Sequence, residues 1–331
     1  MVAPAAGIPA EGEGLKVIVR VPAGTGKSGA LTLVQRRLIE AAALQEAQDL
    51  LFQHTVLCQT CLPYRDPGDD VREWGRINGK VHLEIAAGKA MHPILGRRVP
   101  VGLPFGAKSR LVLTHLNTEA VRTGSSEIEV GSSLAGFVRQ LKLDAHGRNM
   151  TAIKDQLTRL SAASIGLGIV HEGQAITVNA HIVTAFSLWP PNDERQRVFW
   201  PQTVRLSQEY FDSLQRHAVP LDEGAIRALA HSAMALDIYA WLAQRLHRIA
   251  RDKPQFVPWA ALHEQFGFHY SRIRKFREVF LEALRQVAAV YPEARVGEEL
   301  NRQGKPAGLV LYNSPTPVPK LMVSVRVQDC G

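Results

Sequence analysis

Apolar residues recur along the chain in a pattern that predicts the same order of elements twice. The first set comprises a helix over 111–121, a short strand over 127–130, helices over 132–143 and from Asn149, and strands over 164–170 and 175–179. The second set comprises a long helix over 226–249, helices over 257–266 and 270–290, and strands over 294–296 and 309–312. This repeated order predicts an α+β fold with two tandem winged helix-turn-helix domains.

The remaining segments set the expected domain limits. Residues 1–30 are rich in Ala, Gly and Pro and are expected to form a flexible N-terminal segment. A helix over 31–51, a short strand at Thr55–Cys58 and a strand over 80–85 follow. Of two linker-like stretches, Trp189–Asp193 and Val219–Gly224, the second is the better boundary because a long helix starts after it. The expected divisions are a first domain with an N-terminal extension over 31–220, a second domain over 221–319 and a flexible tail over 320–331.

The charge of the chain favours an anionic partner. Of its 331 residues, 39 are Lys or Arg and 31 are Asp or Glu, which gives a net charge of +8 and a pI near 9.6. Three cysteines cannot form a disulfide framework and indicate a reducing compartment. No secretory signal is evident, and no apolar stretch approaches the roughly 18 residues that a membrane helix needs. We therefore expect a cytoplasmic protein with no membrane partner.

Basic residues cluster at the start of the third helix of the second set. The positions opposite or beside its apolar face are Ser271, Arg272, Arg274, Lys275 and Arg277. In helix-turn-helix proteins this end enters the major groove, where Arg binds guanine and Lys neutralises phosphate. Two further cations, Arg302 and Lys305, lie between the last two strands and would contact the backbone of an adjacent groove. The alternative is a solvated basic face that pairs locally with Glu278 and Glu282.

The third helix of the first set is a weaker candidate for DNA contact. Its predicted contact residues are Arg148, Asn149, Thr151, Lys154 and Arg159, of which Thr, Asn and Arg can read base edges. The following turn, His171–Gln174, carries no Lys or Arg. We therefore expect the second set of elements (the second module) to supply more of the salt-dependent affinity for DNA than the first set (the first module). The alternative for this helix is an ordinary surface helix.

Two short motifs suggest chemistry other than DNA binding. Gly24–Ser28 follows strand-like sequence as a phosphate-binding loop would, but the GxxxxGK[ST] pattern requires Gly where the chain has Val21. Cys58 and Cys61 form a lone CxxC without a second Cys pair, so buried thiols are expected rather than a zinc site. No HExxH, convincing pair of catalytic acids or Ser/His/Asp set is evident. The sequence therefore gives no reason to expect an enzyme, a bound metal or a cofactor.

Several segments resemble RepA-type plasmid replication initiators. They are His54–Arg65, Phe137–Leu141, Gly147–Leu160 and Leu236–Ala243, within a similarity that spans roughly residues 50–315. The resemblance implies two winged-helix domains that bind direct repeats (iterons) in double-stranded DNA at a plasmid origin. It also implies melting of nearby AT-rich DNA, recruitment of the host replication initiator ATPase and replicative helicase, and a homodimeric form joined through the first module.

These observations lead to the hypothesis of an iteron-binding plasmid replication initiator without catalytic activity. Some relatives also repress their own promoter, so both activities fit the resemblance. One alternative is a winged-helix transcriptional regulator with no replication role, which predicts an inverted-repeat operator. The other is a P-loop nucleotide hydrolase built on residues 24–28.

Overall fold

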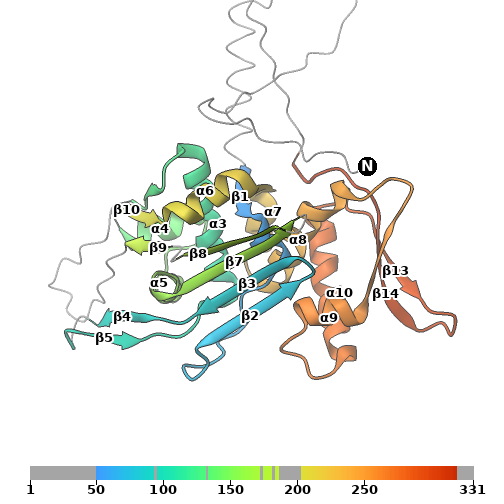
Figure 1. Cartoon of the computed structure of the whole chain (residues 1–331), viewed down its shortest axis with the longest axis horizontal. Coiled ribbons are helices and arrows are strands. Elements are labelled where there is room, and N and C mark those ends of the chain that lie inside the picture. Colours follow the sequence, from blue (N-terminus) through green and yellow to red (C-terminus); the bar gives the residue numbers. More distant parts are fainter. Residues whose placement is uncertain are drawn as a thin grey trace, which may run out of the picture. The chain divides into compact units, whose positions relative to one another are not determined.

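Helices and strands are mixed along the described part of the chain (Figure 1), which confirms the α+β character. A computed structural model gives the structure of residues 50–92, 95–131, 133–171, 174–180, 183–185 and 203–318. The predictions for residues 1–49, 189–193 and 320–331 lie outside these residues. Leu51–Pro317 form one compact unit. Among the helices described, none has the length and apolar character needed to cross a membrane.

The first predicted set of elements contributes two strands to a four-stranded sheet. Its members are α3 (Gly106–Thr123), β6 (Glu127–Glu129), α4 (Leu134–Gln140), α5 (Gly147–Ala162), β7 (Ser164–His171) and β8 (Gln174–Ala180). The β7–β8 hairpin joins β2 (Glu73–Asn78) and β3 (Val81–Ala86) in an antiparallel sheet of order β2-β3-β7-β8. Alternation along β3 buries every second residue, and this face belongs to the same apolar core as α3 and α5.

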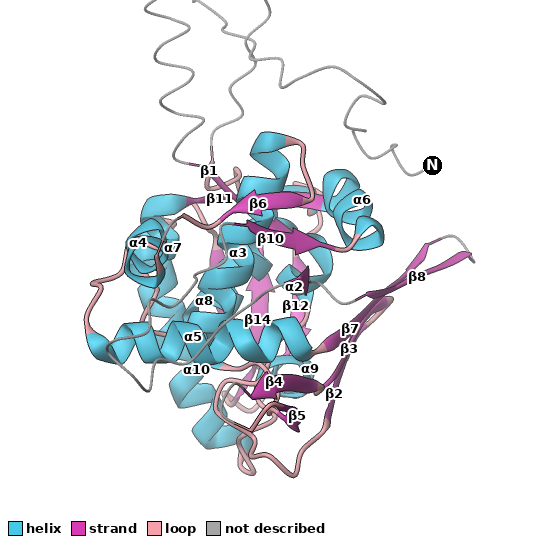
Figure 2. Cartoon of the chain, turned by 90° about the vertical axis from the view of Figure 1, so that its left-hand side faces the viewer, coloured by secondary structure: helices cyan, strands magenta, loops and turns pink. Residues whose placement is uncertain are grey.

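Smaller elements flank this sheet. The strands β4 (Lys89–His92) and β5 (Arg97–Pro100) form a separate hairpin beside α5 (Figures 1 and 2). A three-stranded sheet of order β6-β10-β9 contains β9 (Val183–Ala185) and β10 (Thr203–Leu206), and α6 (Gln208–His217) follows it. The short strand of the first set, β6, therefore pairs with β10 rather than with the β7–β8 hairpin.

The second predicted set forms a compact group of three helices and a small sheet. Its elements are α8 (Ala233–Arg245), the single turn η1 (Leu246–Arg248), β12 (Gln255–Pro258), α9 (Trp259–Phe266), α10 (Ile273–Val290), β13 (Val296–Leu300) and β14 (Pro306–Leu311). The antiparallel sheet has the order β12-β14-β13. Trp241, Phe266, Phe276 and Phe280 are buried together, with edge-on or tilted contacts between their rings.

The predicted strand at Thr55–Cys58 is wrong, because these residues form the helix α2 (Thr55–Gln59). The preceding His54 has an extended backbone, and its Nδ1 accepts the N–H of Val56 as an N-cap. All four predicted residues are buried, so the segment is enclosed on every side. A continuous apolar run fits a buried helix as well as a strand, and here the cap decides for the helix.

The predicted single helix over 226–249 is also wrong. The segment contains α7 (Glu223–Ala228), then a break, and then α8, whose N-cap is the Ser232 side chain. The linker-like stretch before it is the strand β11 (Ala218–Asp222), which pairs with β1 (Leu50–His54). Its Asp222 N–H donates to the buried Tyr239 hydroxyl at 3.0 Å. A boundary at residue 220 thus falls inside an ordered strand.

Candidate nucleic-acid interface

The turn between α9 and α10 fixes the start of the predicted recognition helix. Gly267 ends α9, and its N–H donates to the carbonyl of His263 at 2.7 Å. A Cβ at Gly267 would lie only 2.5 Å from Cδ2 of His263, so a larger residue does not fit without movement. The His263 ring donates to the Tyr270 carbonyl at 2.7 Å and packs edge-on against the buried Phe276. These contacts set the direction in which α10 leaves the turn.

The cations at the start of α10 face solvent. The side chain of Arg274 is 86% exposed and that of Lys275 is 65% exposed, and each lies 3.4 Å from the Glu278 carboxylate. The hydrogen bond from Lys275, followed by that from Arg274, lowers the pKa of Glu278. One carboxylate is therefore shared by two cations, and the turn keeps a positive charge. The other predicted contacts here are Ser271 and Arg272, which are exposed, and Arg277, which is half-buried.

The tip of the β13–β14 hairpin holds the other two predicted cations of this module. The Asn301 side-chain oxygen accepts the N–H groups of Gln303 and Lys305 at 2.9 and 3.0 Å. Gly304 has φ +71°, a conformation that side chains with a Cβ rarely adopt. Arg302 and Lys305 are both exposed on this ordered loop.

The predicted contacts on α5 differ in their surroundings. Arg148 and Thr151 are exposed, and Asn149 is half-buried with its side-chain N–H₂ donating to the Asp144 carbonyl at 2.9 Å. Lys154 is half-buried, and partial burial lowers its pKa. Part of the turn His171–Gln174 lies outside the described residues. The first module thus offers fewer exposed cations than the start of α10.

The side chain of Arg159 is held inside the fold by ion pairs and hydrogen bonds. Its side chain is only 12% exposed, and its guanidinium lies 3.0 Å from the carboxylates of both Asp66 and Asp155. It also donates to the Leu103 carbonyl at 3.1 Å and lies 4.9 Å from the centre of the Phe105 ring. These contacts hold the last turn of α5 against the segment that precedes α3. We therefore remove Arg159 from the proposed DNA contacts.

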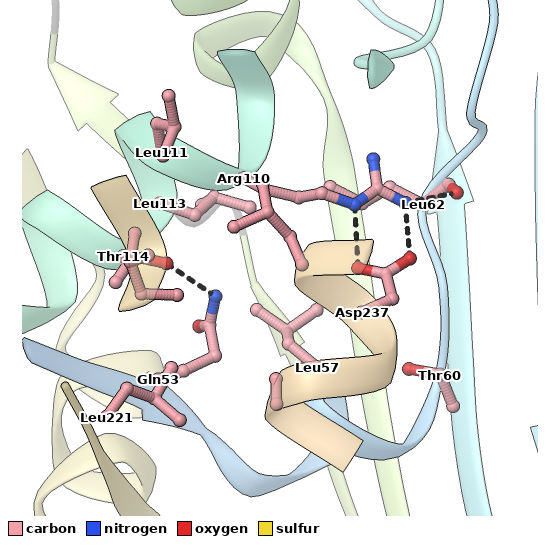
Figure 3. Close-up of a pocket in the computed structure, with 13 residues that line it drawn as sticks. Gln53, Leu57, Thr60, Leu62, Arg110, Leu111, Leu113, Thr114, Leu221 and Asp237 are labelled. Atoms are coloured by element: carbon pink, nitrogen blue, oxygen red, sulfur yellow. Dashed lines mark hydrogen bonds and ion pairs between the residues drawn. The ribbon is translucent and has the colours of Figure 1, made fainter. Parts of the chain in front are cut away.

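Sequence reasoning missed a buried ion pair that joins the two halves. Arg110 on α3 meets Asp237 on α8 through two parallel contacts of 2.7 Å (Figure 3), and both side chains are less than a tenth exposed. Arg110 also donates to the carbonyls of Leu62 and Pro63 at 2.8 and 3.2 Å. Burial raises the pKa of Asp237, and the adjacent guanidinium opposes that rise. The available signal was a lone aspartate within the otherwise apolar run Leu236–Ala243.

The two cysteines of the CxxC motif are buried, as expected. Cys58 is 2% exposed and Cys61 is 1% exposed, and both belong to the apolar core around α8. Burial raises the pKa of both thiols, and Cys61 donates to the Gln265 carbonyl. In the described ranges no group of three or more His, Cys, Asp or Glu residues is arranged to hold a metal ion.

Comparison with known proteins finds a matching family and similar solved structures. Residues 103–260, a little under half of the chain, match the family described as plasmid encoded RepA protein. No curated protein matches the sequence. Two crystal structures of domains 2 and 3 of RctB, one of them a SeMet derivative, are similar at 10% identity. The SeMet structure has a TM-score of 0.48 over 75% of this chain and 93% of its own, and the other has 0.47 over 79% and 97%.

The family match confirms the resemblance to RepA-type plasmid replication initiators over residues 103–260. Three of the four segments that carried the resemblance lie inside this region, and His54–Arg65 lies before it. The matched region runs from α3 to the start of α9, so α10 and the β13–β14 hairpin lie beyond it. The match supports a role in the initiation of plasmid replication.

Proposed function

We propose that the protein initiates plasmid replication by binding iterons through two winged-helix modules. Each module would place its third helix, α5 or α10, in a major groove, with the two sites about one helical turn apart. The observation that carries this proposal is the exposed cationic start of α10, held by the turn at Gly267. The order of helices and strands from α8 to β14, with β14 between β12 and β13, also supports it.

The later steps of initiation are part of the same proposal. Origin-bound protein would open adjacent AT-rich DNA and recruit the host initiator ATPase and the replicative helicase. A dimer joined through the first module would repress the gene's own promoter. The hydrolase alternative concerns residues 24–28, outside the described residues, and deletion of residues 1–30 separates it because DNA binding should then remain.

Selection of bound sequences from random duplex DNA at near-physiological salt tests the binding proposal. We expect enrichment of one asymmetric motif about two helical turns long, because two different modules contact successive grooves. An inverted repeat would instead favour a transcriptional regulator. Salt-sensitive binding without any enriched motif would refute sequence-specific recognition.

Arg274→Ala should weaken binding to the selected motif by about 1–3 kcal/mol and relax specificity at one position, as loss of a base contact does. Arg285→Ala is the matched control, since Arg285 lies on the exposed side of the same helix and also pairs with a nearby glutamate, Glu282. It is eleven residues further along, about 16 Å from Arg274 along the helix axis. Equal loss on selected and unrelated DNA with Arg274→Ala would contradict a base-reading role.

Lys305→Ala should weaken binding to a similar degree on every sequence. A contact with phosphate carries no sequence information, and its loss should reduce the slope of log K against log salt by about one unit. Titrations of selected and unrelated duplexes across a salt series measure both quantities. An unchanged slope would exclude Lys305 from the phosphate contacts.

A further inference from the structure

The hairpin β4–β5 is a feature that the proposed function leaves unused. It pairs Lys89–His92 with Arg97–Pro100 in antiparallel register, and it lies before the region matched by the family. Beyond the paired strands, the N–H of Gly96 donates to the His92 carbonyl at 2.9 Å, and that of Leu95 donates to the His92 ring at 3.2 Å. At about 3.3 Å per residue, the paired part is roughly 13 Å long.

The stem of this hairpin is fixed to the last turn of α5. A Cβ at Gly88 would lie 1.8 Å from the Ala162 carbonyl oxygen, and one at Gly102 would lie 2.2 Å from Nη1 of Arg159. At Gly88 the stem therefore approaches the α5 backbone more closely than a residue with a side chain could, and at Gly102 it packs against the Arg159 side chain. Arg72 adds a clamp, because its guanidinium donates to the carbonyls of Ala87, Gly88 and Val101 at 2.8 to 2.9 Å. A partner that meets α5 would meet the hairpin in a set position.

The hairpin carries cations and contains no acidic residue. Between Glu84 and Glu119 the chain has no Asp or Glu. Lys89, Arg97 and Arg98 are exposed, and no carboxylate within the structure described here forms an ion pair with them. Directly opposed residues share a face, so the pairing His92 with Arg97 and Met91 with Arg98 puts one arginine on each face of the ribbon.

The tip adds an apolar group to this charged ribbon. Leu95 is 53% exposed beside Gly96, which has φ +59°. A β-hairpin with cations on both faces can enter a DNA groove, because a phosphate backbone bounds the groove on each side. An exposed leucine at its end suits the floor of that groove, where apolar side chains contact or part the bases.

We propose that the β4–β5 hairpin is a third DNA contact, which enters the minor groove next to the major groove occupied by α5. This inference rests on the proposed function, because it takes α5 as bound to duplex DNA. Lys89, Arg97 and Arg98 neutralise phosphates on the two walls, and Leu95 contacts the floor. The groove across one backbone from a major groove is a minor groove, and the hairpin lies beside α5 on a stem fixed to that helix.

The test uses the full chain and the duplex motif obtained by selection. The variant K89Q/R97Q/R98Q should raise the Kd on the order of 10- to 100-fold at 0.15 M salt and lower the salt slope by two to three units. Dimethyl sulfate interference separates the grooves, since it modifies guanine N7 in the major groove and adenine N3 in the minor groove. We expect the variant to lose adenine interference at one end of the motif and to keep the guanine signals.

Two further variants make the result decisive. R216Q/R227Q/R285Q removes the same charge from other exposed positions and should leave the adenine signals intact. Leu95→Ser should weaken binding without changing the salt slope, because it removes no charge. Unchanged affinity of the hairpin variant, or an equal loss in the control triple, would overturn the hairpin contact while wild-type selection still supports the proposed function. If the wild-type chain selects no DNA at all, both proposals fail.

Discussion

Replacing Arg110 by alanine is expected to lower the free energy of unfolding by about 3–5 kcal/mol, because it leaves the Asp237 carboxylate buried without its partner. The guanidinium also satisfies the carbonyls of Leu62 and Pro63, which would lose these donors. Asp237→Ala should have a similar effect from the other side. Chemical denaturation at pH 7 measures both.

A double-mutant cycle distinguishes the ion pair from general loss of packing. The double variant R110A/D237A should be more stable than the sum of the single losses predicts, since neither charge is then left alone. Arg285→Ala, which breaks the exposed pair with Glu282, is the control and should change stability by less than about 1 kcal/mol. Additive single effects would show that the two groups do not act as a pair.

Lowering the pH from 7 to 5 is expected to reduce stability by about 4 kcal/mol through two histidines alone. Burial, and then the nearby His217, lowers the pKa of His54 to about 3, while burial and then Arg122 lower that of His115 to about 4. In the unfolded chain both would titrate near 6.5. Below that pH the unfolded state binds protons that the folded state excludes, so stability is present at pH 7 and is lost as the pH falls.

The contacts of His54 explain why its pKa is low, and they indicate the variant that tests its contribution to the pH dependence of stability. Its Nδ1 accepts the N–H of Val56 and its Nε2 donates to the Ser213 hydroxyl at 3.0 Å, so a second ring proton would have to displace the helix cap. His54→Gln should remove about 2 kcal/mol of the pH-dependent change. Denaturant titrations at pH 7, 6 and 5 measure this difference, and an unchanged dependence in the variant would show that His54 titrates normally.

Local pattern predicted α10 well because its buried face is a property of one segment. Phe276, Phe280 and Val287 recur at helical spacing and all lie in the core. The pattern failed where the deciding partner is remote. Nothing in the sequence of β11 shows that it pairs with β1. The strand β12 was missed because its partner residues in β14 lie fifty or more residues away in the sequence.

In the candidate site, too, local features could be predicted from the sequence and long-range contacts could not. Composition located the cations of α10 and of the β13–β14 hairpin, and the structure leaves all of them exposed except Arg277, which is half-buried. It could not show that Arg159 is held by Asp66, which is 93 residues away, or that Arg110 and Asp237 meet across 127 residues. Free and paired cations look alike in a sequence, because the pairing depends on the complete fold.

The pairing of β1 with β11 has a consequence for the order in which the chain can fold during synthesis. β1 emerges first among the described elements, yet its partner strand begins only at Ala218, after the whole first module has been made. Until then β1 has no partner strand, and unpaired strands are sites of aggregation. Closing so long a loop is also slow relative to forming local helices. The first module therefore completes its structure only once the second has begun to appear, and a fragment that stops before residue 218 lacks a strand that its own N-terminal region requires.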